Sequence, residues 1–145
     1  MAAIQRSAAT FRISGPDLDP AEITRLLGCA PDAAQRRGQE IPGRGSGSAR
    51  IARTGMWRLS ANEREPADLG SQIIELLSNM TDDLTIWASI ADKYHIDLFC
   101  GLFMQGRNEG LSISPPLLVS LGLRRIELGL DIYSGDDPAR KSDRP

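Results

Sequence analysis

Alternating and helical spacings of apolar residues divide the first part of the chain into a strand, a turn and a helix. Residues 10–13 alternate polar and apolar side chains of types that favour strands, and the glycine and proline at 15–16 break the strand. A helix is predicted to follow, because Asp19 is placed to accept from its first N–H groups and Pro20 fits its first turn. Gly28 is expected to end it, since glycine readily adopts the left-handed conformation that closes many helices.

Similar patterns predict further elements in the rest of the chain. Apolar residues recur at intervals of two in strands and of three or four in helices. The predicted elements are a strand at 55–60, helices at 67–80 and 84–94, a strand at 95–104, a helix at 115–122 and a strand at 128–134. The first two of these helices are expected to pair as a hairpin. The strand after them is apolar on both faces, which predicts a central place in the sheet.

The two ends of the chain follow the same plan, and this plan predicts a fold. Each has a strand, a glycine turn, a capping residue before proline, a leucine-rich helix and a glycine stop. Two βαβ halves separated by the helical pair at 66–94 would form an α+β, ferredoxin-like split βαβ sandwich with an inserted helical hairpin and a long flexible loop. We therefore expect a single domain at 8–134, with flexible tails at 1–7 and 135–145.

One face of that sheet is expected to stay open. Alternation along the predicted strands places seven charged and aromatic residues on it: Arg12, Arg58, Asp97, Phe99, Phe103, Asp131 and Tyr133. Exposed aromatic residues among charges are typical of protein interfaces, which favours a protein partner or self-association. One alternative is burial beneath the loop at 29–54. Another, a platform for single-stranded RNA, is disfavoured because the basic, glycine-aromatic signature is missing and two carboxylates would repel phosphate.

The segment at 29–54 is rich in glycine, serine and arginine. A loop of this length is unusual in a compact domain, where long loops are functional or mobile. The simpler interpretation is a solvated, flexible insertion. The alternative is an anion-binding loop that becomes ordered on binding, in which Arg36 and Arg37, with Arg58 at the sheet edge, converge on phosphate or carboxylate.

Charge and composition argue against several classes of protein. The 145 residues include 17 basic and 19 acidic side chains, a net charge of −2, which argues against a protein whose whole surface binds nucleic acid or anionic membrane. The hydrophobic share of 41% is ordinary for one globular core. No apolar run approaches the roughly 20 residues that cross a bilayer, and the N-terminus lacks a signal-peptide core, so we expect a cytoplasmic protein without membrane contact.

Residues suited to catalysis or cofactor binding are few. His95 is the only histidine, and no nucleophile motif lies near it in the sequence. Cys29 and Cys100 are too few for a zinc site and are expected to be free thiols, with Cys100 inert inside an apolar strand. The glycine pattern at 43–48 lacks the lysine of a phosphate-binding loop. We therefore expect no enzymatic activity, no metal and no cofactor.

Three stretches carry a resemblance to a known family. They are FRISGPDLDPAEITRLLGCAP near the N-terminus, TGMW before the second predicted strand, and LSISPPLLVSLGLRRIELGLDIY near the end. Over residues 8–134 the chain resembles the bacterial family catalogued as domain of unknown function 4279. The resemblance implies a small cytoplasmic bacterial protein and brings no established activity or catalytic residues. The link before Trp57 is longer and richer in arginine and glycine than is expected for this family.

Two functional hypotheses follow from these observations. The leading one is a non-enzymatic protein-binding module, such as a toxin-neutralising or accessory protein, whose partner contacts the aromatic residues of the sheet face. The alternative is a small-molecule sensing domain that binds an anionic metabolite through Arg36, Arg37 and Arg58.

Overall fold

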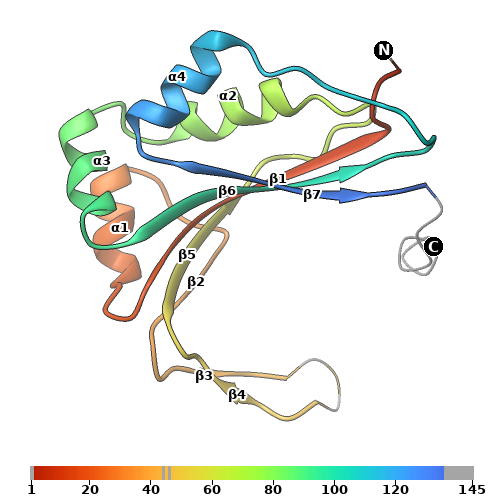
Figure 1. Ribbon diagram of the computed structural model, residues 1–145. Coiled ribbons are helices and arrows are strands. Elements are labelled where there is room, and N and C mark those ends of the chain that lie inside the picture. Colours follow the sequence, from red (N-terminus) through yellow and green to blue (C-terminus); the bar gives the residue numbers. More distant parts are fainter. Residues whose placement is uncertain (1, 44, 46, 136–145) are drawn as a thin grey trace.

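A curved five-stranded sheet with all four helices on one side organises the protein (Figure 1). The structure is a computed structural model that describes residues 2–43, 45 and 47–135. The strand order is β2-β5-β1-β6-β7, in which only β6 and β7 are parallel neighbours. The strands are β1 (Arg6–Gly15), β2 (Ala33–Gln35), β5 (Gly55–Ser60), β6 (His95–Phe103) and β7 (Glu127–Tyr133). The helices are α1 (Pro20–Leu27), α2 (Leu69–Asn79), α3 (Leu84–Ala91) and α4 (Pro115–Leu123). The α+β prediction is confirmed.

Alternate residues of β1 build the centre of the core. Phe11, on the helix-covered face, lies between Trp57 of β5 and Trp87 of α3 in two edge-to-face contacts, with ring centroids 5.9 and 5.6 Å apart. Both indole N–H groups are satisfied, one by Thr24 Oγ1 at 3.1 Å and the other by the carbonyl oxygen of Thr81 at 2.8 Å. Edge-to-face packing adds to the free energy gained by burying these large rings.

The local signals around α1 are confirmed. The Asp19 carboxylate accepts from the Ala21 N–H at 3.0 Å, Pro20 occupies the first turn, and Gly28 ends the helix at a φ of 79°. Ser114, which resembles Asp19 in preceding a proline, makes no side-chain cap hydrogen bond to α4. The cap-then-proline pattern therefore predicts where both helices begin. Only at α1 does the capping residue also make the expected hydrogen bond.

The ferredoxin-like prediction is not confirmed, because the strands pair differently. In a split βαβ fold each half has two parallel strands with a third strand between them. Here β1 and β5, which flank α1, are direct antiparallel neighbours, and only β6-α4-β7 joins a parallel pair. The predicted helical hairpin is also not confirmed. α2 packs against β1 and α4, while the connection before α3 is bound to the end of α1 through the Thr81 N–H and the Leu27 carbonyl oxygen.

Residues 2–7 are anchored, in contrast to the flexible tail expected at 1–7. β1 begins at Arg6, four residues before the predicted strand, because its alternation continues through small side chains that pair with the far end of β6. Ile4 and Ser7 are buried, and the carbonyl oxygen of Ile4 accepts from the Ala67 N–H at 3.0 Å. At the other end, residues 136–145 of the tail predicted at 135–145 lie outside the described residues.

The segment at 29–54 forms an arm in place of a structureless loop. β2 extends the sheet beyond β5, and β3 (Glu40–Ile41) pairs with β4 (Arg50–Ile51) as a separate two-stranded ribbon. We call the described residues between 36 and 54 the arm. It projects from the sheet edge on the side that carries no helices (Figure 1). It therefore lies beside the open sheet face without burying all of it.

Candidate functional site

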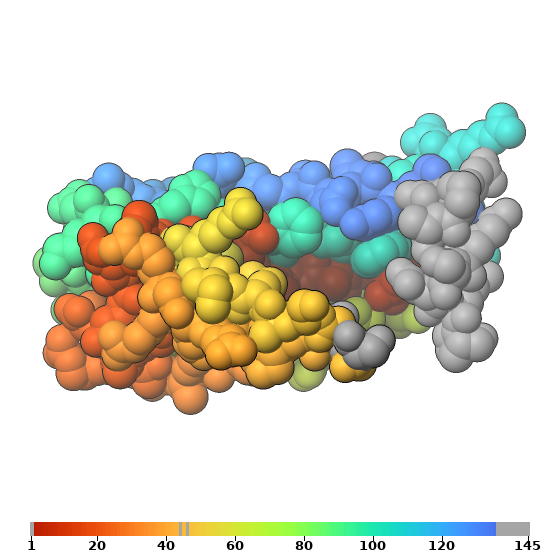
Figure 2. Space-filling model, turned by 90° about the horizontal axis from the view of Figure 1, so that it is seen from below, coloured from red at the N-terminus to blue at the C-terminus, as the bar shows by residue number. Residues whose placement is uncertain are grey.

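The open face of the sheet gathers the residues predicted for it. The strand register places Arg12 between Arg58 of β5 and Asp97 of β6, and places Phe103 beside Tyr133 of β7. All seven predicted residues lie on this face, which is opposite Phe11 and the helices: Arg12, Arg58, Asp97, Phe99, Phe103, Asp131 and Tyr133. Seen from below in Figure 2, β1 forms the floor of a hollow between the arm, in orange and yellow, and the strands β6 and β7, in teal and blue.

Arg12 and Asp97 form the polar centre of this face. Arg12 Nε donates to Asp97 Oδ1 at 2.9 Å and Nη2 donates to Oδ2 at 2.5 Å, in the two-point geometry that guanidinium and carboxylate groups favour. The same guanidinium lies 4.6 Å from the ring centroid of Phe99. The hydrogen bonding to Asp97 raises the pKa of Arg12 above its already high ordinary value. Asp97 is therefore a neutralised structural partner, and Phe99 is held in place by the cation beside it.

A second cluster of rings lies at the far end of the face. Phe103 and Tyr133 are stacked, with centroids 4.9 Å apart and planes 5° from parallel. Arg6 extends the stack, because its guanidinium carbon lies 3.8 Å from the Phe103 centroid while Nη1 donates to Glu63 at 3.0 Å. The Tyr133 hydroxyl donates to Asp131 at 2.5 Å. Arg6 was missed by the sequence prediction because the strand was expected to begin at Thr10.

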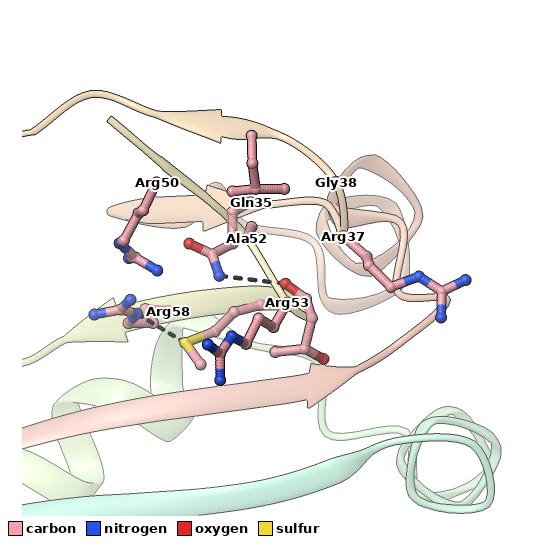
Figure 3. Close-up of a pocket in the computed structure, with 10 residues that line it drawn as sticks. Gln35, Arg37, Gly38, Arg50, Ala52, Arg53 and Arg58 are labelled. Carbon is pink, nitrogen blue, oxygen red and sulfur yellow. Dashed lines mark hydrogen bonds between the residues drawn. The ribbon is translucent and has the colours of Figure 1, made fainter. Parts of the chain in front are cut away.

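A pocket of about 1020 Å³ lies where the arm joins β5 (Figure 3). Four arginines line it, namely Arg37, Arg50, Arg53 and Arg58, and its lining contains no acidic residue. In Figure 3, Arg50, Arg53 and Arg58 lie on one side of the pocket, and the Arg37 side chain points away from them. The guanidinium groups of this pocket give it a positive local field within a chain of net charge −2.

The structure places the two arginines predicted for anion binding at the base of the arm, beside α1. Arg36 Nη2 donates to Asp19 at 2.7 Å, and Arg37 Nη2 donates to Asp17 at 3.2 Å. Arg36 does not line the pocket, and Arg37 lines it with its guanidinium already paired. Of the predicted anion-binding residues, Arg58 alone reaches the pocket without a carboxylate partner among the described residues. Arg50 and Arg53 belong to the arginine-rich segment for which anion binding was considered, but they were not among the residues predicted for the site.

The groups considered for catalysis are separated from one another. His95 is exposed, with Nε2 3.7 Å from Glu127. Cys100 is buried on the helix-covered side of β6, where burial raises the pKa of its thiol to about 12. Within residues 2–43, 45 and 47–135 no three His, Cys, Asp or Glu side chains are grouped so that they could hold a metal ion. The helices in the same ranges are all too short or too polar to cross a membrane.

Comparison with known proteins gives one match. The family model described as a domain of unknown function (DUF4279) matches residues 4–135. Neither a curated protein nor a solved structure matches the chain.

Proposed function

Because the chain belongs to this family of unknown function, as its sequence resemblance predicted, we propose its role from its own geometry: it is a non-enzymatic protein-binding module. The open sheet face is the docking surface, and the stacked Arg6–Phe103–Tyr133 cluster with Phe99 carries the proposal. These ring and guanidinium groups belong to the residue types enriched at the centres of protein interfaces.

The face is suited to binding because its side chains are already fixed. Phe99 is 38% exposed and lies against Arg12, which is itself held by Asp97. Side chains that are ordered before binding lose less conformational entropy when a partner arrives. A complementary surface has an apolar centre, to cover the rings, and carboxylates at its border, to meet Arg58, which donates to the sulfur of Met56 and has no carboxylate partner among the described residues.

The shape of the face supports a protein partner. The arm stands beside the sheet and makes the face the floor of a hollow (Figures 1 and 2), so an inserted loop or helix would contact sheet and arm together. A module that acts by covering another protein's surface needs no catalytic group, and toxin-neutralising and accessory proteins act in this way. We assign it to the bacterial cytoplasm, where Cys29 and Cys100 would stay reduced as free thiols.

Affinity purification with matched variants tests this function. The wild-type protein, the face variant Phe99→Ala/Tyr133→Ala and the control Ile74→Ala/Val119→Ala are each used as bait. The control removes two exposed apolar side chains from α2 and α4, away from the face. We expect a partner retained by wild type and control and lost by the face variant, with direct binding then confirmed by calorimetry on purified proteins. Recovery of the same partners by the face variant would remove this surface from the proposal.

Self-association is tested with the same three proteins. Light scattering across a concentration series measures whether the wild type forms a dimer. A dimer that is lost in the face variant and kept in the control would identify the partner as a second copy of the chain.

A further inference from the structure

The pocket between the arm and β5 has a defined backbone frame. Gln35 Nε2 donates to the carbonyl oxygen of Thr54 at 3.2 Å, joining the sheet edge to the end of the arm. The Gly38 N–H donates to the carbonyl oxygen of Ala52, and the Ala52 N–H donates to the carbonyl oxygen of Gln39, both at 2.8 Å. These hydrogen bonds fix the positions from which the arginine side chains extend.

Three arginines of this pocket have unused hydrogen-bond donors. Arg50, Arg53 and Arg58 have no carboxylate partner among the described residues. Arg58 Nε donates to the sulfur of Met56 at 3.0 Å, and thioether sulfur is only a weak acceptor. The contrast with Arg36 and Arg37, which both reach an aspartate, shows that ion pairs form in this region where a carboxylate is available.

We propose that this pocket binds a small soluble polyanion of the phosphate class through Arg50, Arg53 and Arg58. Guanidinium groups bind phosphate oxygens with paired, charge-assisted hydrogen bonds, and three of them match a ligand with at least two negative charges. The bound anion relieves the repulsion among the three cations. Ile51, Ala52 and Met56 also line the pocket and provide apolar contact for an organic part of the ligand.

The anion pocket differs from the proposed protein-docking face in its position and in most of its residues. Its arginines include two from the arm, whereas the stacked rings of Phe103 and Tyr133 belong to the opposite end of the sheet. Arg58 is the one residue common to both surfaces. The ring variant separates the two proposals, because Phe99 and Tyr133 do not line the pocket and their loss leaves the anion site intact.

Calorimetric titration with inorganic pyrophosphate and orthophosphate, at constant ionic strength set by sodium chloride, tests the site. The site variant is Arg50→Gln/Arg53→Gln/Arg58→Gln. The control, Arg25→Gln/Lys93→Gln/Arg107→Gln, removes the same charge from three exposed positions outside the pocket. Circular dichroism establishes that both are folded.

We expect saturable binding of pyrophosphate, tighter than that of orthophosphate, to the wild type and the control. The site variant should bind at least about tenfold more weakly, because each charge-assisted hydrogen bond lost costs more than a factor of ten in affinity. The Phe99→Ala/Tyr133→Ala variant should bind as the wild type does. Absence of saturable binding by the wild type, or equal affinities in site variant and control, would overturn the proposal.

Discussion

Arg12 and Asp97, 85 residues apart in the sequence, meet on adjacent strands as a two-point ion pair at the centre of the uncovered sheet face. The pair neutralises the carboxylate of Asp97, whose side chain is only 12% exposed, and holds the cation that lies beside Phe99. It therefore connects the register of the two central strands to the arrangement of the proposed docking surface.

Replacing Asp97 by alanine should destabilise the fold moderately. The substitution removes two hydrogen bonds, but the Arg12 side chain is 34% exposed, so solvent compensates in part and we expect a loss of about 1 kcal/mol in the free energy of unfolding. Urea denaturation measures it. The control is Asp92→Ala, which removes the exposed pair with Arg125 and should cost about 0.5 kcal/mol or less. Equal losses of stability in the two variants would show that the Arg12–Asp97 pair stabilises the fold no more than an exposed ion pair does.

Two phenylalanines on opposite faces of the sheet should respond very differently to truncation. Phe11→Ala removes the ring between Trp57 and Trp87 and should cost about 3–5 kcal/mol, as large cavities in cores do. Phe99→Ala removes a ring already in contact with solvent and should cost about 1 kcal/mol or less. Thermal and urea unfolding of the two variants test this difference. A large loss for Phe99→Ala would show that the open face is part of the core.

Local pattern was enough to place the residues of the open face. Alternation with a period of two fixes which face a side chain occupies once a strand is recognised, so Asp97, Phe99 and Tyr133 were placed correctly from the sequence. Arg12 and Asp97 were predicted to share this face, whereas their contact follows from the pairing of β1 with β6. Arg6 was missed because small residues at the start of β1 give a weak strand signal.

Strand order and ion-pair choice could not be predicted in the same way. Both depend on contacts between distant segments, and nothing local distinguishes antiparallel β1–β5 pairing from the parallel halves that the repeated plan suggested. Likewise, Arg36 and Arg50 are equivalent in the sequence pattern. Only the fold brings one of them to Asp19 and the other to the pocket.

Gln72 should be sensitive to an apolar substitution although it lies on an otherwise apolar helix face. Its side chain is fully buried, accepts from Ser7 Oγ at 2.7 Å and donates to the carbonyl oxygens of Ser7 and Asn62, each at 3.0 Å. Gln72→Leu leaves the Ser7 hydroxyl without its acceptor and should cost about 1–2 kcal/mol in urea denaturation. The exposed Gln105→Leu is the matched control and should be close to neutral. If Gln72→Leu caused no loss of stability, the hydrogen bonds of Gln72 would not stabilise the fold as proposed.

Two helix-capping aspartates should make stability depend on pH. Hydrogen bonds from Ser71 and Thr85 hold the pKa values of Asp68 and Asp83, respectively, below the ordinary value of 3.8. A lowered folded-state pKa means that the unfolded state binds protons more readily. The stabilisation is therefore complete above about pH 4 and is lost as the pH falls through the lowered pKa values.

The measurement for this pH effect is the urea midpoint between pH 6 and pH 2. We expect the urea midpoint to fall less with decreasing pH in Asp68→Asn/Asp83→Asn than in the wild type, because the amide keeps an acceptor oxygen and does not titrate. Asp82→Asn, which changes a side chain without a hydrogen bond among the described residues, should follow the wild type. Parallel profiles for all three proteins would show that the caps do not contribute.

The two cysteines should differ in reactivity toward iodoacetamide. Burial raises the pKa of Cys100 to about 12, so at pH 8 only about one thiol in ten thousand is ionised, and the fold also blocks access to it. Cys29 is half-buried and its pKa is raised by partial desolvation alone, which slows its reaction without preventing it. Mass spectrometry should therefore find one adduct, on Cys29, in the native protein and two adducts after unfolding in urea. Labelling of Cys100 in native protein at the rate of Cys29 would mean that β6 opens readily, because the thiolate can form and react only when the strand leaves the core.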